Sequence, residues 1–450
     1  MVNLQVDFGK TVGKIKAMHA TGQPPFTGGF LQLNFTPMQY LTDAGVPYCR
    51  LHDVGGAFGG NRFVDIPNIF RDFDADETLP DSYDFAFTDE LIKAMHEYNL
   101  RPIFRLGVTI ENQAHIKAYR IHPPKDYQKW ARICEHIVRH YNEGWANGFH
   151  FGITYWEIWN EPENGPKPTL NQMWTGTAEE YYRLYDTTAK HLKNCFGDTI
   201  KVGGYGACGF YGIYYHPEKY GVEVETREKD ERYEKDIYRV EFLYGFLEYI
   251  KEHQSPIDFF SWHSYADVKK TVVMSAFLHR VLREYGYDKL ETHLNEWNNA
   301  HELQYFAKSY SSAQVAAMMC AMQNSETDKL FYYDSRIFAS RYCALFNPYT
   351  RMPCCTYYSF IAFNALYALG NQAECVCEKE GVYAVAAVNG KKKAVLIVNT
   401  TGENMTVDTK LDKGFTVYLL DEEHFLAPTD CNANSFALNS NQVMLLKNYE

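Results

Sequence analysis

From residue 14 to residue 370 the chain repeats one pattern of apolar and polar positions. A short apolar run is followed by a polar loop and then by a longer stretch with apolar residues at three- and four-residue spacing. The short runs predict buried strands, and the longer stretches predict amphipathic helices. We predict strands at 14–23, 47–53, 101–108, 151–160, 200–206, 257–265, 290–297 and 329–335. We predict helices at 88–99, 125–143, 178–195, 240–253, 273–286, 311–324 and 356–370.

Eight units of this kind predict an α/β fold, a (β/α)8 TIM barrel over residues 14–370. An open doubly wound sheet is the alternative, but no G-x-G-x-x-G motif opens a strand-to-helix turn. From residue 371 the pattern holds strands only, and Asn389 followed by Gly390 is a strong hairpin signal. We therefore predict a small C-terminal β-sandwich domain over 371–450. The alternating apolar residues within 1–13 predict one further strand for it.

The composition of the chain limits the kinds of molecule that it is expected to bind. The chain of 450 residues carries 44 Lys and Arg against 56 Asp and Glu, a net charge of −12, which argues against nucleic acid. We expect no membrane association, because no secretory signal and no apolar run of about 18 residues is found. The 11 cysteines fit no zinc pattern and predict reduced thiols in a cytoplasmic protein. The protein could also form a homo-oligomer.

Two carboxylates follow predicted barrel strands. The fourth strand ends in Trp159-Asn160-Glu161-Pro162, and the seventh ends in Asn295-Glu296-Trp297. Barrel active sites lie at the C-terminal ends of the strands, so we expect both carboxylates there. Pro162 stops its strand and favours an extended conformation for Glu161. Burial beside aromatic rings predicts a raised pKa for Glu161.

A pair of carboxylates is what glycoside hydrolysis requires. One protonates the departing oxygen, and the other attacks the anomeric carbon or activates water. Asn160 could hold the sugar 2-hydroxyl group. This chemistry needs no metal and no organic cofactor. The structural alternative is that Glu161 is a loop or helix-capping carboxylate and that Glu296 is a salt-bridge partner.

These motifs resemble those of retaining (β/α)8 glycosidases, and most closely glycoside hydrolase family 39, the β-xylosidase and α-L-iduronidase family. YWEIWNEPE resembles the acid/base segment of that family, and THLNEWNN resembles its nucleophile segment. YCRLHD, KVGGYG and FFSWHSY resemble its strands two, five and six. The resemblance covers about 14–370, and it implies a barrel with a small β-sandwich built from the chain ends.

The resemblance also implies site roles. Glu161 would be the acid/base, Glu296 the nucleophile and Asn160 the ligand of the 2-hydroxyl group. Sugar contacts would come from His52 and His263, with Tyr265 beside the nucleophile. The remaining candidates for substrate binding are Arg50, Trp297 and Asp334.

Two of these candidates have structural alternatives. Arg50 shares strand parity with His52, so it could point toward the carboxylates and keep Glu296 ionised, or it could pair with Glu157. Asp334 could bind a sugar or pair with Arg336.

The sequence thus predicts a retaining, β-xylosidase-like exo-glycosidase that acts on small oligosaccharides or glycosides. An α-L-arabinofuranosidase or a uronic-acid glycosidase on the same fold is the nearest alternative. A carbohydrate-binding protein without turnover is a second. A metal-dependent barrel hydrolase using His52, Asp53 and His263 is a third, although no H-x-H or H-E-x-x-H spacing supports it.

Overall fold

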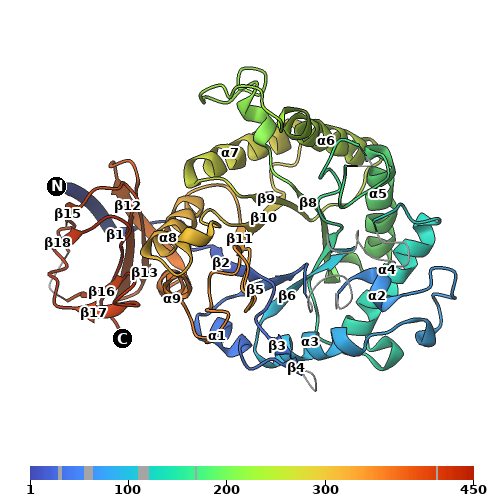
Figure 1. Ribbon diagram of the computed structural model, residues 1–450, viewed down its shortest axis with the longest axis horizontal. Coiled ribbons are helices and arrows are strands. Elements are labelled where there is room, and N and C mark those ends of the chain that lie inside the picture. Colours follow the sequence, from blue (N-terminus) through green and yellow to red (C-terminus); the bar gives the residue numbers. More distant parts are fainter. Residues whose placement is uncertain (29–32, 55–63, 110–120, 168–169, 412–413) are drawn as a thin grey trace. The chain divides into compact units, whose positions relative to one another are not determined.

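The computed structural model describes residues 1–28, 33–54, 64–109, 121–167, 170–411 and 414–450. Eight strands form a closed barrel in the order β10-β11-β2-β5-β6-β7-β8-β9, which confirms the predicted fold (Figure 1). The pairs β11–β2, β5–β6, β6–β7, β7–β8 and β8–β9 are parallel. The barrel strands are β2 (Ala17–Gly22), β5 (Tyr48–Leu51), β6 (Arg101–Leu106), β7 (Tyr155–Ile158), β8 (Lys201–Ala207), β9 (Phe259–Ser264), β10 (Glu291–Trp297) and β11 (Lys329–Tyr332).

The predicted helices are present, with ends that shift by a few residues. The longer ones are α3 (Ala86–Glu97), α4 (Tyr127–Asn142), α5 (Ala178–Phe196), α6 (Tyr233–Glu252), α7 (Val268–Tyr285), α8 (Ser309–Gln323) and α9 (Cys355–Tyr367). The short helices are α1 (Met38–Asp43) and α2 (Ile66–Ile69). Polar side chains fix two helix starts: Asp126 accepts from the first turn of α4, and Thr177 forms a capping box with Glu180 on α5.

Several barrel strands are shorter than their predicted ranges, and β7 is shortened most. β7 begins at Tyr155, although the apolar run begins at Phe151. The side chain of Asn142 bonds both the N–H and the C=O of Ile153, at 2.7 and 2.9 Å. Because these backbone groups are already satisfied, that part of the run stays outside the strand.

A second sheet follows the barrel in sequence and contains nine strands in the order β17-β16-β19-β14-β13-β12-β1-β15-β18. Its members are β1 (Val2–Lys14), β12 (Asn371–Cys377), β13 (Val382–Asn389), β14 (Lys392–Asn399), β15 (Met405–Asp408), β16 (Thr416–Leu420), β17 (Ala427–Thr429), β18 (Ser435–Leu438) and β19 (Val443–Lys447). A two-stranded sheet pairs β3 (Thr27–Gly28) with β4 (Leu33–Asn34).

The second sheet has the features of the predicted sandwich. β1 pairs antiparallel with β12 and parallel with β15, with register shifts between Asp7 and Gly13, so the alternating N-terminal segment is a strand of this sheet. Strands toward both ends of the sheet contribute to one buried apolar cluster, for example through Val417 of β16 and Phe436 of β18. The hairpin between β13 and β14 turns at Gly390, whose φ of +57° suits glycine.

The chain divides into two compact units. One contains Met1–Pro47, Tyr265–Val272 and Trp297–Glu450, and the other contains Tyr48–Ser264 and Val273–Glu296. The second unit holds the two carboxylates of the candidate site. Among the described residues, no helix combines the length and the apolar character needed to cross a membrane.

Candidate active site

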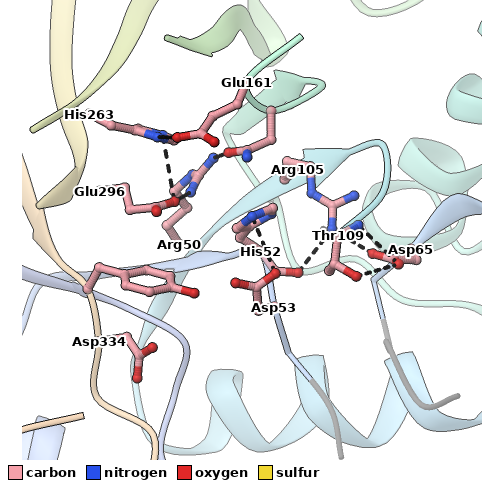
Figure 2. Close-up of polar contacts among 12 residues, drawn as sticks. Arg50, His52, Asp53, Asp65, Arg105, Thr109, Glu161, His263, Glu296 and Asp334 are labelled. Atoms are coloured by element: carbon pink, nitrogen blue, oxygen red, sulfur yellow. Dashed lines mark hydrogen bonds and ion pairs between the residues drawn. The ribbon is translucent and has the colours of Figure 1, made fainter. Parts of the chain in front are cut away.

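The structure brings the two predicted carboxylates together. Glu296 lies near the C-terminal end of β10, and Glu161 follows the last residue of β7, Ile158, by three positions. One oxygen of each carboxylate and one ring nitrogen of His263 all lie within 4.8 Å of one another (Figure 2). All three side chains are at least largely buried, so their charges interact in a poorly solvated setting.

His263, near the C-terminal end of β9, lies between the two carboxylates. Its Nδ1 is 2.8 Å from Oε1 of Glu161, and its Nε2 is 3.7 Å from Oε2 of Glu296. Burial lowers the pKa of His263, but the charges of Glu296 and Glu161 outweigh burial, so the pKa is raised above 6.5. The two carboxylates therefore favour the protonated form of the imidazole.

Arg50, on β5, makes both of the contacts that the sequence left as alternatives. Its Nε donates to Glu157 at 2.8 Å, and its Nη1 donates to Oε2 of Glu296 at 3.2 Å. Its Nη2 donates to Oδ1 of Asn160 at 2.6 Å. The guanidinium group is buried, so these charge-assisted bonds fix its position and that of its three partners.

Glu157 is a functional neighbour that the sequence indicated only as a partner for Arg50. Its carboxylate is fully buried and also accepts from Ser261 at 2.6 Å and from Asn295 at 2.5 Å. Burial raises the pKa of Glu157, but Arg50 and the two hydrogen bonds lower it overall. The ionised carboxylate therefore connects β5, β7, β9 and β10 beneath the site.

The backbone of Glu161 differs from the sequence prediction. Pro162 led us to expect an extended Glu161, but its φ is +46°, and Trp159 also has a positive φ of +73°. The N–H of Glu161 donates to the carbonyl of Gly206 at 3.0 Å, and its carbonyl accepts from the N–H of Asn164 at 3.0 Å. These two bonds hold a conformation that is unfavourable for a non-glycine residue, and such strain is common at active sites.

Gly206 itself was missed by sequence reasoning. A Cβ atom there would lie 3.1 Å from Oδ1 of Asn160 and 3.3 Å from both Arg50 and His263. Its φ is +64° as well. The three glycines of KVGGYG could have indicated a close approach to the backbone. Their spacing alone does not predict which of them lies against the side chains of the site.

The predicted pKa shift of Glu161 is wrong in direction. Burial does raise the pKa, but the hydrogen bond and charge of His263, together with the charge of Arg239, lower it to about 2. For Glu296, burial and the charge of Glu161 outweigh His263 and Arg50, so its pKa is raised. The sequence could not show that His263 donates to one carboxylate and lies farther from the other.

His52 lies beside this cluster, and Asp53 and Arg105 contact it. Its Nε2 is 3.3 Å from Oδ1 of Asp53, and its backbone carbonyl accepts from Nη2 of Arg105 at 2.9 Å. Arg105 also pairs with Asp65 at 2.6 Å, and Asp65 accepts from Thr109 (Figure 2). Burial and the charges of Arg50 and Arg105 lower the pKa of His52 well below 6.5, against the effect of Asp53, so its ring is neutral.

Glu163 is a buried carboxyl group that the sequence analysis did not single out. Its Oε1 accepts from the backbone N–H of Cys208 at 2.6 Å, and among the described residues its Oε2 has no hydrogen-bond partner. Burial raises its pKa to about 7, with Glu161 adding to the effect against the Cys208 bond. The only indication of Glu163 in the sequence was its place as the second glutamate of NEPE.

The other three predicted residues belong to the other compact unit. Tyr265 is half-buried, with its ring 5.5 Å from that of Tyr342. Trp297 is fully buried and packs edge-on against Tyr332 at 5.3 Å. Asp334 pairs with Arg336 at 2.7 Å, which is the second of its two predicted alternatives. Their roles as sugar contacts stay predictions.

The site also contains donor atoms that metals use. Glu161, His263 and Glu296 together offer two oxygens and one nitrogen. Arg50 already places a positive charge 3.2 Å from Glu296, and both carboxylates favour the cationic form of His263. This charge distribution fits two carboxylates that take part in acid–base and nucleophilic chemistry better than it fits ligands of a cation.

A closed (β/α)8 barrel with one carboxylate just after β7 and a second near the C-terminal end of β10 is typical of (β/α)8 glycoside hydrolases. The sequence model described as Glycosyl hydrolases family 39 matches residues 29–331, more than half of the chain. The chain therefore belongs to glycoside hydrolase family 39, as its strand motifs predicted.

The curated relatives include two β-xylosidases. The enzyme of Geobacillus stearothermophilus is 25% identical over 241 residues, which are 52% of this chain and 39% of that protein. The enzyme of Caldicellulosiruptor saccharolyticus is 29% identical over 130 residues, 27% of this chain and 25% of that protein. The matched segments thus span less than half the length of either relative.

Solved structures support the fold over the whole chain. A glucosidase from Croceicoccus marinus aligns with a TM-score of 0.75 at 20% identity, covering 99% of this chain and 98% of that one. A glycoside hydrolase family 30 subfamily 8 xylanase from Clostridium acetobutylicum aligns with a TM-score of 0.59 at 14% identity, covering 99% of each. At such identities the likeness concerns the fold alone.

Proposed function

We propose that this chain is a retaining, β-xylosidase-like glycosidase that removes terminal sugar residues from small oligosaccharides by double displacement. The observation that carries the proposal is the short distance between Glu161 and Glu296. A carboxylate oxygen of Glu161 lies within 4.8 Å of a carboxylate oxygen of Glu296. Retaining glycosidases hold their carboxyl groups about 5–5.5 Å apart, whereas inverting enzymes leave about 6.5–9.5 Å for a water molecule. The short separation favours direct attack by one carboxylate.

Glu296 is the nucleophile in this mechanism. Nη1 of Arg50 lies 3.2 Å from its Oε2 and favours the ionised form that attack requires, against the effect of burial. Oδ1 of Asn160 is occupied by Arg50, so its amide nitrogen is oriented to donate to the sugar 2-hydroxyl group. Attack forms an ester bond between Glu296 and the anomeric carbon while the bond to the leaving oxygen breaks.

Glu161 is the acid/base, and His263 supplies its proton. In the free enzyme the proton is on Nδ1 of His263, 2.8 Å from Oε1 of Glu161. During the first step it moves to Glu161 as the carboxyl group protonates the leaving oxygen. In the second step water attacks the anomeric carbon, Glu161 takes the water proton, and the ester bond to Glu296 breaks. Return of that proton to His263 restores the starting state.

A xylose unit is the substrate that the relatives favour, since both are named β-xylosidases. We further propose that residues 14–370 form the catalytic barrel and that 371–450, with 1–13, form an accessory β-sandwich. Pairing of β1 with β12 and β15 supports this division. None of the 11 cysteines forms a disulfide bond, which supports a cytoplasmic location, because reducing compartments keep thiols reduced.

A panel of aryl β-xylosides, α-L-arabinofuranosides, β-glucosides and glycuronides tests the proposal. We expect the fastest release from a xyloside, and Glu296→Gln should lose turnover of every substrate. Glu161→Gln should lose on the order of 10²–10⁴-fold in rate for poor leaving groups and much less for a nitrophenolate, which needs no proton. Faster release of arabinose or a uronic acid would change the sugar only. Saturable sugar binding with no turnover would contradict the proposed enzyme.

A further inference from the structure

A second cluster of ligand-type side chains lies on the outer wall of the barrel, away from the residues that carry the proposed reaction. Glu135 comes from α4, and His191 and Cys195 come from α5. One oxygen, one ring nitrogen and the sulfur of these three residues lie within 4.8 Å of one another. None of them is used by the mechanism above.

The spacing of these residues explains why they meet. His191 and Cys195 are four positions apart on α5, so they share one face of that helix. Nε2 of His191 is 2.5 Å from Oε2 of Glu135, and Sγ of Cys195 is 3.8 Å from the same ring nitrogen. In a tetrahedral zinc site, ligand atoms lie about 2.0–2.3 Å from the metal and hence about 3.4–3.6 Å from one another. Small movements of these side chains would reach that geometry.

The exposure of the cluster is suited to metal entry. The side chains of Glu135 and His191 are 14% and 22% exposed, and Cys195 is half-buried. Water can therefore reach the three ligand atoms and could supply a fourth ligand.

Arg139 is a positively charged neighbour of the cluster. Its Nε donates to Oε1 of Glu135 at 2.7 Å, and its guanidinium group lies 5.0 Å from the ring of Phe196. It also pairs with Glu143 on the same helix. Arg139 thus engages the carboxylate oxygen of Glu135 that does not contact His191, which leaves Oε2 directed toward the ring.

We propose that Glu135, His191 and Cys195 form a binding site for Zn²⁺ or a chemically similar transition-metal ion that joins α4 to α5. One nitrogen, one sulfur and one carboxylate oxygen form a donor set that suits Zn²⁺ and does not suit Mg²⁺ or Ca²⁺, which prefer oxygen alone. Binding releases the thiol proton to solvent as the Cys195 thiolate bonds the metal. The bound ion stabilises the native chain without entering the glycosidase reaction.

Cobalt(II) titration of the reduced full-length protein tests this site. We expect a near-ultraviolet charge-transfer band from a thiolate–cobalt bond that saturates at one equivalent and is removed by Zn²⁺. Cys195→Ser should abolish the band, whereas Cys431→Ser, which removes an exposed thiol, should leave it intact. A band that persists in Cys195→Ser, or the lack of any band at excess cobalt, overturns the proposal.

Thermal unfolding gives an independent readout. Zn²⁺ should raise the Tm of the wild-type protein and of Cys431→Ser but not that of His191→Asn or Glu135→Gln. If those two variants keep the wild-type Tm shift, the metal binds elsewhere. Because the cluster is separate from Glu161 and Glu296, failure of either test leaves the proposed glycosidase function untouched.

Discussion

Nδ1 of His263 lies 2.8 Å from Oε1 of Glu161, so the proposed acid/base carboxyl is hydrogen-bonded to an imidazole in the free protein. The pKa of His263 is raised, while that of Glu161 is lowered to about 2. The proton needed by the leaving group is therefore held by the pair, mainly on the ring. This relationship determines the expected pH dependence.

The pH profile of kcat/KM should be bell-shaped, with both limbs shifted to higher pH. Activity needs Glu296 ionised, and its pKa is raised, so the acidic limb should lie above 4.5. Activity also needs a proton on the Glu161–His263 pair, which is lost as the pH rises through the raised pKa of His263, above 6.5. Initial rates across the pH range would measure both limbs.

His263→Gln tests the role of the ring as proton donor. The amide can still donate to Glu161, but it cannot carry the proton, so kcat/KM should fall on the order of 10²-fold. The alkaline limb should also move to lower pH, because a carboxyl group alone loses its proton more readily than an imidazolium group. An unchanged profile with a merely lower rate would mean that His263 acts only in positioning.

Arg50→Met should be strongly destabilising as well as inactive. The substitution leaves Glu157 and Glu296 without their buried partner, and loss of one partner of a buried pair typically costs about 3–5 kcal/mol. Urea unfolding would measure the change. Lys93→Ala, which removes an exposed pair with Glu90, is the control and should leave the unfolding midpoint unchanged. Equal midpoints for both variants would refute the account of Arg50.

Glu163→Gln should stabilise the protein at alkaline pH only. The folded-state pKa of Glu163 is raised to about 7, so its carboxyl favours folding while protonated. That contribution is present below the ordinary glutamate pKa and is lost as the pH rises through about 7. The glutamine keeps an oxygen for the N–H of Cys208 and cannot ionise. We expect a Tm equal to that of the wild-type protein at pH 5 and higher at pH 8; a lower Tm at pH 8 would contradict this reading.

The fold could be predicted because each element carries its own periodicity. Strands such as β10 and helices such as α5 fall within a residue or two of the predicted ranges. The main differences come from side chains distant in sequence. Asn142 keeps Ile153 out of β7, and no local pattern indicates that contact.

The sequence could predict that the two carboxylates lie close together, but it could not predict their pKa values. Strand parity left contact with Glu296 and pairing with Glu157 as alternatives for Arg50, and the structure shows both contacts. The pKa of Glu161 depends on the hydrogen bond from the ring of His263 on β9. The orientation of that ring is determined only when the barrel strands come together. The positive φ of Glu161 likewise depends on its bond to Gly206, forty-five positions further along the chain.

The central claim is double displacement by Glu296 with Glu161 as the acid/base, and the most direct measurement is the anomeric form of the first product. Proton NMR would follow hydrolysis of the aryl xyloside, or of whichever glycoside is cleaved fastest, before the released sugar mutarotates. The account predicts that the first-formed sugar has the same anomeric configuration as the substrate. First appearance of the opposite anomer would show single displacement by water and would contradict the account.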